Sequence, residues 1–157
     1  MDYNATTNNI QKIEIYQHNT ARSIPIMHTV LELALEATID FVLIQEPYIA
    51  SDNRGTVSHP AYIAILPRPR DDIRPRVAIY ARKDTAFKYT ARPDIIDDSD
   101  VLALTVSGDS IAPFELYNVY NEKGLGDSEE YTVKRSLQNI NPGRRAIISG
   151  DFNAYYS

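Results

Sequence analysis

Residues 145–154 read RAIISGDFNA, and this stretch decides how the rest of the chain is interpreted. Residues 146–148 form a short apolar run with β-branched side chains, which predicts a strand covered on both faces. We expect Gly150 to end that strand in a sharp turn. Asp151 and Asn153 lie two positions apart, so in extended backbone their side chains point to the same side.

Asp151 and Asn153 therefore place one carboxylate and one amide at the end of a strand. A carboxylate binds a metal or orients a water, and an amide donates to a phosphate oxygen, so the two residues suit a metal-assisted phosphate site. A loop that opens with an Asx turn is an equally good interpretation of these two residues alone. The rest of the chain has to distinguish these interpretations.

The composition indicates one globular domain or part of one. The chain has 157 residues, of which 43% are hydrophobic and 10% aromatic, enough for a packed core. There is no cysteine, which excludes a disulfide scaffold and a thiolate zinc site. No apolar run is long enough to span a bilayer, and the N-terminus lacks the order of a signal peptide, so an intracellular protein without membrane association is expected. We expect residues 1–11 to be flexible and residues 12–157 to form the domain.

The charge is distributed unevenly along the chain. The net charge is −5, yet residues 67–92 carry eight basic and three acidic side chains. A basic segment in an acidic chain can attract a polyanion locally. Four arginines in or beside a proline-rich connector over 67–75 either contact a nucleic-acid backbone or only keep the connector soluble: Arg68, Arg70, Arg74 and Arg76.

Hydrophobic periodicity predicts strands and helices in a mixed α/β (α+β) order. Ser23 and Pro25 mark the start of an amphipathic helix that extends to about residue 38, with Met27, Val30, Leu31, Ala34 and Leu35 as its apolar stripe. The predicted strands cover 12–18, 40–45, 61–66, 76–81, 86–91, 101–107, 113–120 and 146–148, and a second helix covers about 127–139. We expect 86–91 to be the hairpin partner of 76–81, and 101–107 to pair with 113–120. Such an order indicates two sheets packed face to face with helices outside.

Four of the predicted strands end in polar side chains that suit an active site. Asn19, Glu46 and Asp151 follow three of them, and Tyr120 ends a fourth. Polar groups gathered at strand ends on a rigid scaffold are a common way to build a catalytic site.

Four short motifs resemble the endonuclease/exonuclease/phosphatase superfamily. They are Gln17-His18-Asn19, Gln45-Glu46-Pro47-Tyr48, Asn118-Val119-Tyr120 and Gly150-Asp151-Phe152-Asn153-Ala154, in this order along nearly the whole chain. Glu46-Pro47-Tyr48 and Arg74-Pro75-Arg76 are similar to the branch that contains the endonuclease domains of LINE-type (non-LTR) retrotransposons.

This resemblance implies part of a four-layered αββα sandwich, DNase-I-like, that cleaves DNA phosphodiesters with Mg²⁺. It implies that Glu46 is the metal ligand with Asn19 beside it, that Tyr120 hydrogen-bonds the scissile phosphate, that Asp151 activates the attacking water, and that Asn153 supports the phosphate. Mg²⁺ needs few protein ligands when substrate supplies the rest, which agrees with these roles. A retroelement product of this kind would act in the nucleus.

The same resemblance implies that the C-terminal half of the domain is missing. Family members continue past the Gly-Asp-Phe-Asn motif to a further Asp and a terminal histidine. This chain has Tyr155 and Tyr156 where the branch has histidines, and a phenol does not replace imidazole as a proton carrier near neutral pH. We therefore expect a weakly stable chain that associates through an exposed sheet face and has little or no activity.

Three functions follow from these observations. The first is a truncated endonuclease domain, and the second is a non-catalytic remnant or binding module that keeps the same fold. The third is a phosphoesterase of the same superfamily that acts on small phosphates or lipid headgroups.

Overall fold

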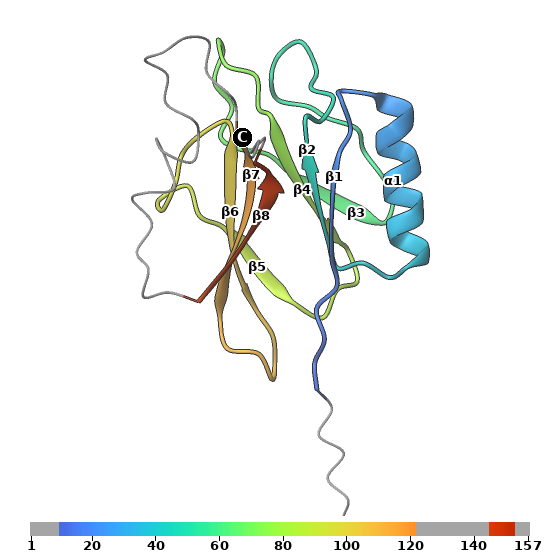
Figure 1. Ribbon diagram of the computed structural model, residues 1–157, viewed down its shortest axis with the longest axis vertical. Helices are drawn as coiled ribbons and strands as arrows, with labels where there is room; N and C mark the ends of the chain where they lie inside the picture. The colour runs from blue at the N-terminus through green and yellow to red at the C-terminus, as the bar shows by residue number, and fades with distance from the viewer. Residues whose placement is uncertain (1–9, 122–144, 153–157) are drawn as a thin grey trace, which may run out of the picture.

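The computed structural model describes residues 10–121 and 145–152, which form two four-stranded sheets packed face to face (Figure 1). The strand order is β1-β2-β4-β3 in the first sheet and β5-β6-β7-β8 in the second. The elements are β1 (Ile15–Asn19), α1 (Ile24–Glu36), β2 (Phe41–Gln45), β3 (Tyr62–Ile65), β4 (Val77–Arg82), β5 (Lys88–Ala91), β6 (Val101–Ser107), β7 (Phe114–Tyr120) and β8 (Ala146–Asp151). The expected two-sheet sandwich of mixed α and β structure is confirmed. The expected helix over 127–139 lies outside the described residues.

The pairing of the strands brings six strand ends to one end of the sandwich. β1 is parallel to β2, and β7 is parallel to β8, whereas the other pairs are antiparallel. The ends of β1 and β2 therefore lie with the start of β4, and the ends of β7 and β8 lie with the start of β6. Hydrogen bonds from Asn19 to Asp151 and from Arg76 to Asp100 place both sets at the same end of the sandwich. We call this end of the molecule the rim.

The core lies between the sheets and beneath α1. Phe41, Leu43, Ile79, Leu104 and Leu116 belong to the cluster between the sheets, and all five are fully buried. The helix covers the outer face of the first sheet (Figure 1), where its buried residues are Met27, Val30, Leu31 and Ala34.

The cap of α1 follows the sequence, whereas one residue of its predicted stripe does not. Ser23 is the N-cap, and its hydroxyl accepts a hydrogen bond from the Ile26 amide at 3.3 Å. Leu35 is 36% exposed, so its expected place in the core is wrong. In the described part of the chain, no helix is long and apolar enough to cross a membrane.

The structure corrects the expected burial of the 146–148 strand. Among the described strands β8 lies at the edge and pairs only with β7, and Ile147 and Ile148 are 41% and 45% exposed. An apolar run of this length fits both a covered strand and an edge strand, so the sequence pattern did not separate the two.

Gly150 does not make the expected turn, because β8 continues through it to Asp151. Its φ is +156°, and a Cβ at this position would lie 2.0 Å from the Val119 carbonyl oxygen. Glycine therefore lets β8 approach β7 closely just before Asp151, rather than ending the strand.

Two further expectations are corrected. The 86–91 segment is not the hairpin partner of 76–81, because β5 pairs with β6 of the second sheet.

The expected exposed inner sheet face is also absent from the central strands of the described region, since their inner faces bury each other. Exposure on the inner side is found at the edges, at Gln17 of β1 and Ile147 of β8.

We predict that Gly150→Ala lowers the free energy of unfolding by about 3 kcal/mol, because the added methyl overlaps the Val119 carbonyl and β8 must shift. Urea denaturation measures the change. Gly55→Ala is the matched control, since its Cβ would lie 3.5 Å from Ala50 Cβ and should cost little. Equal stability of the two variants would contradict the close approach of β8 to β7.

Candidate metal and phosphate site

Asn19 joins two carboxylates that come from different sheets. Its amide nitrogen, Nδ2, donates to Glu46 Oε2 at 3.0 Å and to Asp151 Oδ2 at 3.0 Å. The two carboxylate oxygens are therefore no further apart than twice 3.0 Å. Asn19 Oδ1 accepts from the Ala21 amide at 2.9 Å, which fixes the orientation of the side-chain amide. The structure thus brings together three residues that are far apart in the sequence.

The backbone around Glu46 is held in an uncommon conformation. Glu46 has φ +48°, and Ala21 and Arg22 have φ +48° and +61°. The Glu46 carbonyl accepts from Thr20 Oγ1 at 2.9 Å and from the Arg22 amide at 2.8 Å, while the Glu46 amide donates to the Arg76 carbonyl at 2.8 Å. Left-handed backbone at residues other than glycine costs free energy and often occurs at functional sites, and here three hydrogen bonds hold it in place.

Tyr120 lies beside Asp151 on the neighbouring strand. The two residues are register partners in the parallel β7–β8 pair, so their side chains point to the same side of the sheet. The Tyr120 ring packs against the core between the sheets, and Arg76 Cζ lies 5.2 Å from the ring centroid. Tyr120 therefore belongs to the same rim as Asn19, Glu46 and Asp151.

Gln45 and Asn118 belong to two of the four motifs, but the buried amide pair that they form under the rim was not predicted from the sequence. Gln45 Nε2 donates to Asn118 Oδ1 at 2.6 Å, and Asn118 Nδ2 donates to the carbonyls of Ile44 and Ala78, each at 2.9 Å. Gln45 and Asn118 are fully buried, so losing either partner would leave a buried polar group with neither that hydrogen bond nor water to replace it. The pair links the two sheets one residue before Glu46 and two residues before Tyr120. The sequence carried a signal for this pair, because each amide lies two residues after a core residue and therefore on the same, inward-facing side of its strand.

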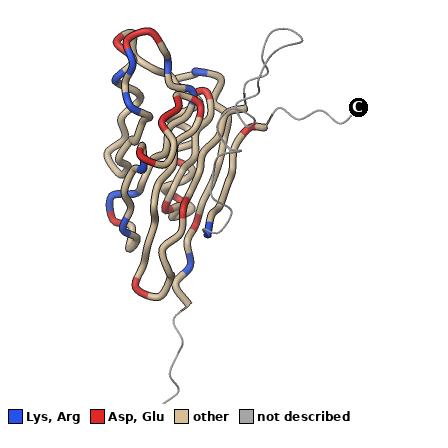
Figure 2. Tube along the Cα trace, turned by 90° about the vertical axis from the view of Figure 1, so that its left-hand side faces the viewer, with Lys and Arg blue, Asp and Glu red and all other residues tan. Residues whose placement is uncertain are grey.

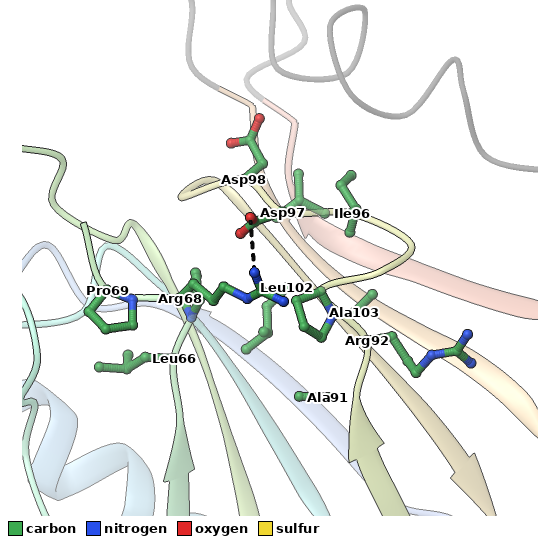
Figure 3. Close-up of a pocket in the computed structure, with 13 residues that line it drawn as sticks. Leu66, Arg68, Pro69, Ala91, Arg92, Ile96, Asp97, Asp98, Leu102 and Ala103 are labelled. Carbon is green, nitrogen blue, oxygen red and sulfur yellow. Dashed lines mark ion pairs between the residues drawn. The ribbon is translucent and has the colours of Figure 1, made fainter.

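The expected arginine surface is divided into three parts. Arg68 Nη1 and Arg70 Nη2 lie 3.9 and 3.5 Å from Asp97 Oδ2. Arg68 and Asp97 both line a cavity of about 220 Å³, where the Arg68 side chain points towards that carboxylate (Figure 3). Arg74 is exposed in the connector. Arg76 instead makes two hydrogen bonds to Asp100 at 2.7 and 2.9 Å, so it does not belong to the exposed connector. Charged residues lie mainly on connecting segments and strand ends (Figure 2).

The donor set at the rim fits a magnesium ion. Mg²⁺ binds through one or two carboxylates and takes its other ligands from water and substrate phosphate. Glu46 and Asp151 supply two carboxylates within reach of one ion, while a cluster of three or more acidic or histidine side chains is absent from the described residues. In this arrangement Asn19 holds both carboxylates through its nitrogen. Asn153 lies outside the described residues.

A comparison with solved structures finds the endonuclease domain of TRAS1, a telomere-specific non-LTR retrotransposon, with a TM-score of 0.68. The identity is 17%, and the match covers 92% of this chain and 61% of that chain. At this identity the similarity establishes the fold alone, so the chain has the expected fold of a non-LTR retrotransposon endonuclease domain. The chain spans less than two thirds of the matched domain. Neither protein-family profiles nor curated proteins match the sequence.

We predict that Asn19→Asp lowers the free energy of unfolding by about 2 kcal/mol without metal, because an amide donor between two carboxylates becomes a third carboxylate. Added Ca²⁺ should stabilise this variant more than the wild type, since a cation replaces the lost donor. Thermal unfolding with and without Ca²⁺ measures both effects.

Gln17→Glu is the matched control for Asn19→Asp. It adds the same charge to the same face of β1 at an exposed position two residues away. If both variants respond alike to Ca²⁺, the bridging role of Asn19 is wrong.

Proposed function

We propose that this chain is the N-terminal portion of a magnesium-dependent phosphodiesterase that resembles the DNA-nicking endonucleases of non-LTR retrotransposons. The single observation that supports this function most strongly is the contact of Asn19 with both Glu46 and Asp151 at the rim of a DNase-I-like sandwich. This contact joins strand ends from both sheets and leaves two carboxylates on one rim.

The rim residues, and Asn153 by its place in the sequence motif, each have a proposed role. Glu46 holds the metal ion, and Asn19 orients Glu46 and Asp151 towards it. Asp151 orients the attacking water and accepts its proton, while Tyr120 donates a hydrogen bond to the scissile phosphate, and Asn153 supports the same phosphate. The ion supplies neutralisation of charge on the phosphate when it is bound. Arg68, Arg70 and Arg74 add DNA-backbone contacts that are independent of sequence and sensitive to salt.

A binding module without catalysis is the second candidate, and one observation favours it. The match covers 61% of the TRAS1 endonuclease domain, so the remainder of that domain has no matched counterpart in this chain. We therefore propose that this chain binds a divalent ion and DNA but cleaves DNA little or not at all. A phosphoesterase for small phosphates has no contact in the described residues that favours it.

We predict that Mn²⁺, an EPR-visible substitute for Mg²⁺, binds at the rim. Glu46→Gln and Asp151→Asn should each weaken Mn²⁺ binding roughly tenfold or more, because each removes one of the two carboxylates. Asp109→Asn is the control, since Asp109 lies in the β6–β7 turn at the opposite end of the sandwich from the rim. Equal affinities for all four proteins would show that the rim holds no metal.

Nicking of supercoiled plasmid in Mg²⁺ separates the two candidates. We expect little conversion to the open-circular form by the 157-residue chain. Robust nicking that Glu46→Ala abolishes would show a complete catalytic site and would overturn the proposal of low activity. Nicking that survives Glu46→Ala would point to a contaminating nuclease, which this comparison detects.

A further inference from the structure

Arg76 makes a forked ion pair between the two sheets at the rim. Arg76 immediately precedes β4 in the first sheet, and Asp100 immediately precedes β6 in the second. Arg76 Nε donates to Asp100 Oδ1 at 2.7 Å, and Nη2 donates to Oδ2 at 2.9 Å. Asp100 is 1% exposed, so its carboxylate has almost no contact with solvent. Two parallel bonds to a planar guanidinium fix its orientation as well as its position.

The same guanidinium lies over the ring of Tyr120. The distance from Arg76 Cζ to the ring centroid is 5.2 Å, within the range of cation–π attraction. The Tyr120 amide also donates to the Asp100 carbonyl at 2.9 Å. Asp100 therefore holds the backbone of Tyr120 directly, and holds its ring through Arg76.

The backbone of Arg76 reaches the metal side of the rim. Its carbonyl accepts from the Glu46 amide at 2.8 Å, and its amide donates to the Ser99 carbonyl at 2.9 Å. One residue thus contacts the backbone of the proposed metal ligand and the ring of the proposed phosphate donor. These contacts come from two sheets and from segments far apart in the chain.

We propose that Arg76, oriented by Asp100, is a positioning residue that holds the Tyr120 ring beside Asp151 for its proposed role at a DNA phosphate. This inference rests on the proposed function. It replaces the expectation that Arg76 contacts the DNA backbone itself, because its side chain is engaged by Asp100 and by the Tyr120 ring.

A similar ion pair at the other end of β4 provides a matched control. Arg82 ends the strand, and its Nη2 donates to Asp40 Oδ1 at 3.2 Å, while Asp40 is 5% exposed. Arg76→Met with Asp100→Asn, and Arg82→Met with Asp40→Asn, each remove one positive and one negative charge. The two double variants therefore keep the same net charge, and only the first removes contacts to Tyr120.

The first readout is the order of the Tyr120 ring, measured by NMR relaxation of ¹³C-labelled tyrosine and assigned with Tyr120→Phe. It requires neither metal nor DNA. We expect the ring to become more mobile in the Arg76/Asp100 double variant, to be less affected in Arg76→Lys, and to be unchanged in the Arg82/Asp40 double variant. An unchanged ring in the first variant overturns the proposal.

The second readout is the affinity for a short fluorescein-labelled DNA duplex in Ca²⁺. Removal of the Arg76/Asp100 pair should weaken binding about tenfold, the loss expected for one hydrogen bond to a charged oxygen. Tyr120→Phe should do the same, and combining the changes should add little, because Arg76 acts through Tyr120. Losses that multiply would show independent contacts and overturn the proposal.

Glu46→Gln separates this proposal from the proposed function. If Glu46→Gln weakens Ca²⁺-dependent DNA binding while loss of the Arg76/Asp100 pair does not, the metal site stands and the role of Arg76 is wrong. If Glu46→Gln has no effect, the proposed function fails, and the positioning role towards phosphate fails with it.

Discussion

The contact between the Asn19 amide and the carboxylates of Glu46 and Asp151 is the interaction on which the site depends. Two carboxylates that share a rim repel each other, and a donor between them reduces that repulsion. The donor, Asn19, comes from β1. The Glu46 carboxylate follows β2 of the same sheet, and the Asp151 carboxylate lies at the end of β8 in the opposite sheet. The site therefore exists only when both sheets are packed in their correct relative positions.

The packing of the sheets is set by apolar and polar contacts together. The apolar cluster between the sheets provides most of the driving force, but apolar contacts alone tolerate small shifts. The buried Gln45–Asn118 pair and the Arg76–Asp100 pair have directional bonds that do not tolerate such shifts. Both lie next to site residues, so they define the geometry at the rim. Close approach of β8 to β7 at Gly150 then places Asp151 beside Tyr120.

Local signals predicted much of the fold, whereas contacts between sheets were not accessible from them. The Ser23 cap, the helix and the polar residues at strand ends follow from short-range patterns that the structure reproduces. The partner of β5 did not follow, because proximity in sequence favours a hairpin while the core required a change of sheet. The edge position of β8 also depends on what lies beside it. Arg76 was placed with the exposed arginines since its partner, Asp100, is distant in the sequence and gives no local signal.

The most direct test of this account is a crystal structure of the protein soaked in Mn²⁺, with anomalous differences measured at the manganese edge. The account predicts a peak between the carboxylates of Glu46 and Asp151, within coordination distance of both. A peak elsewhere, or none at the rim in crystals where Glu46 and Asp151 are ordered and accessible, would contradict it.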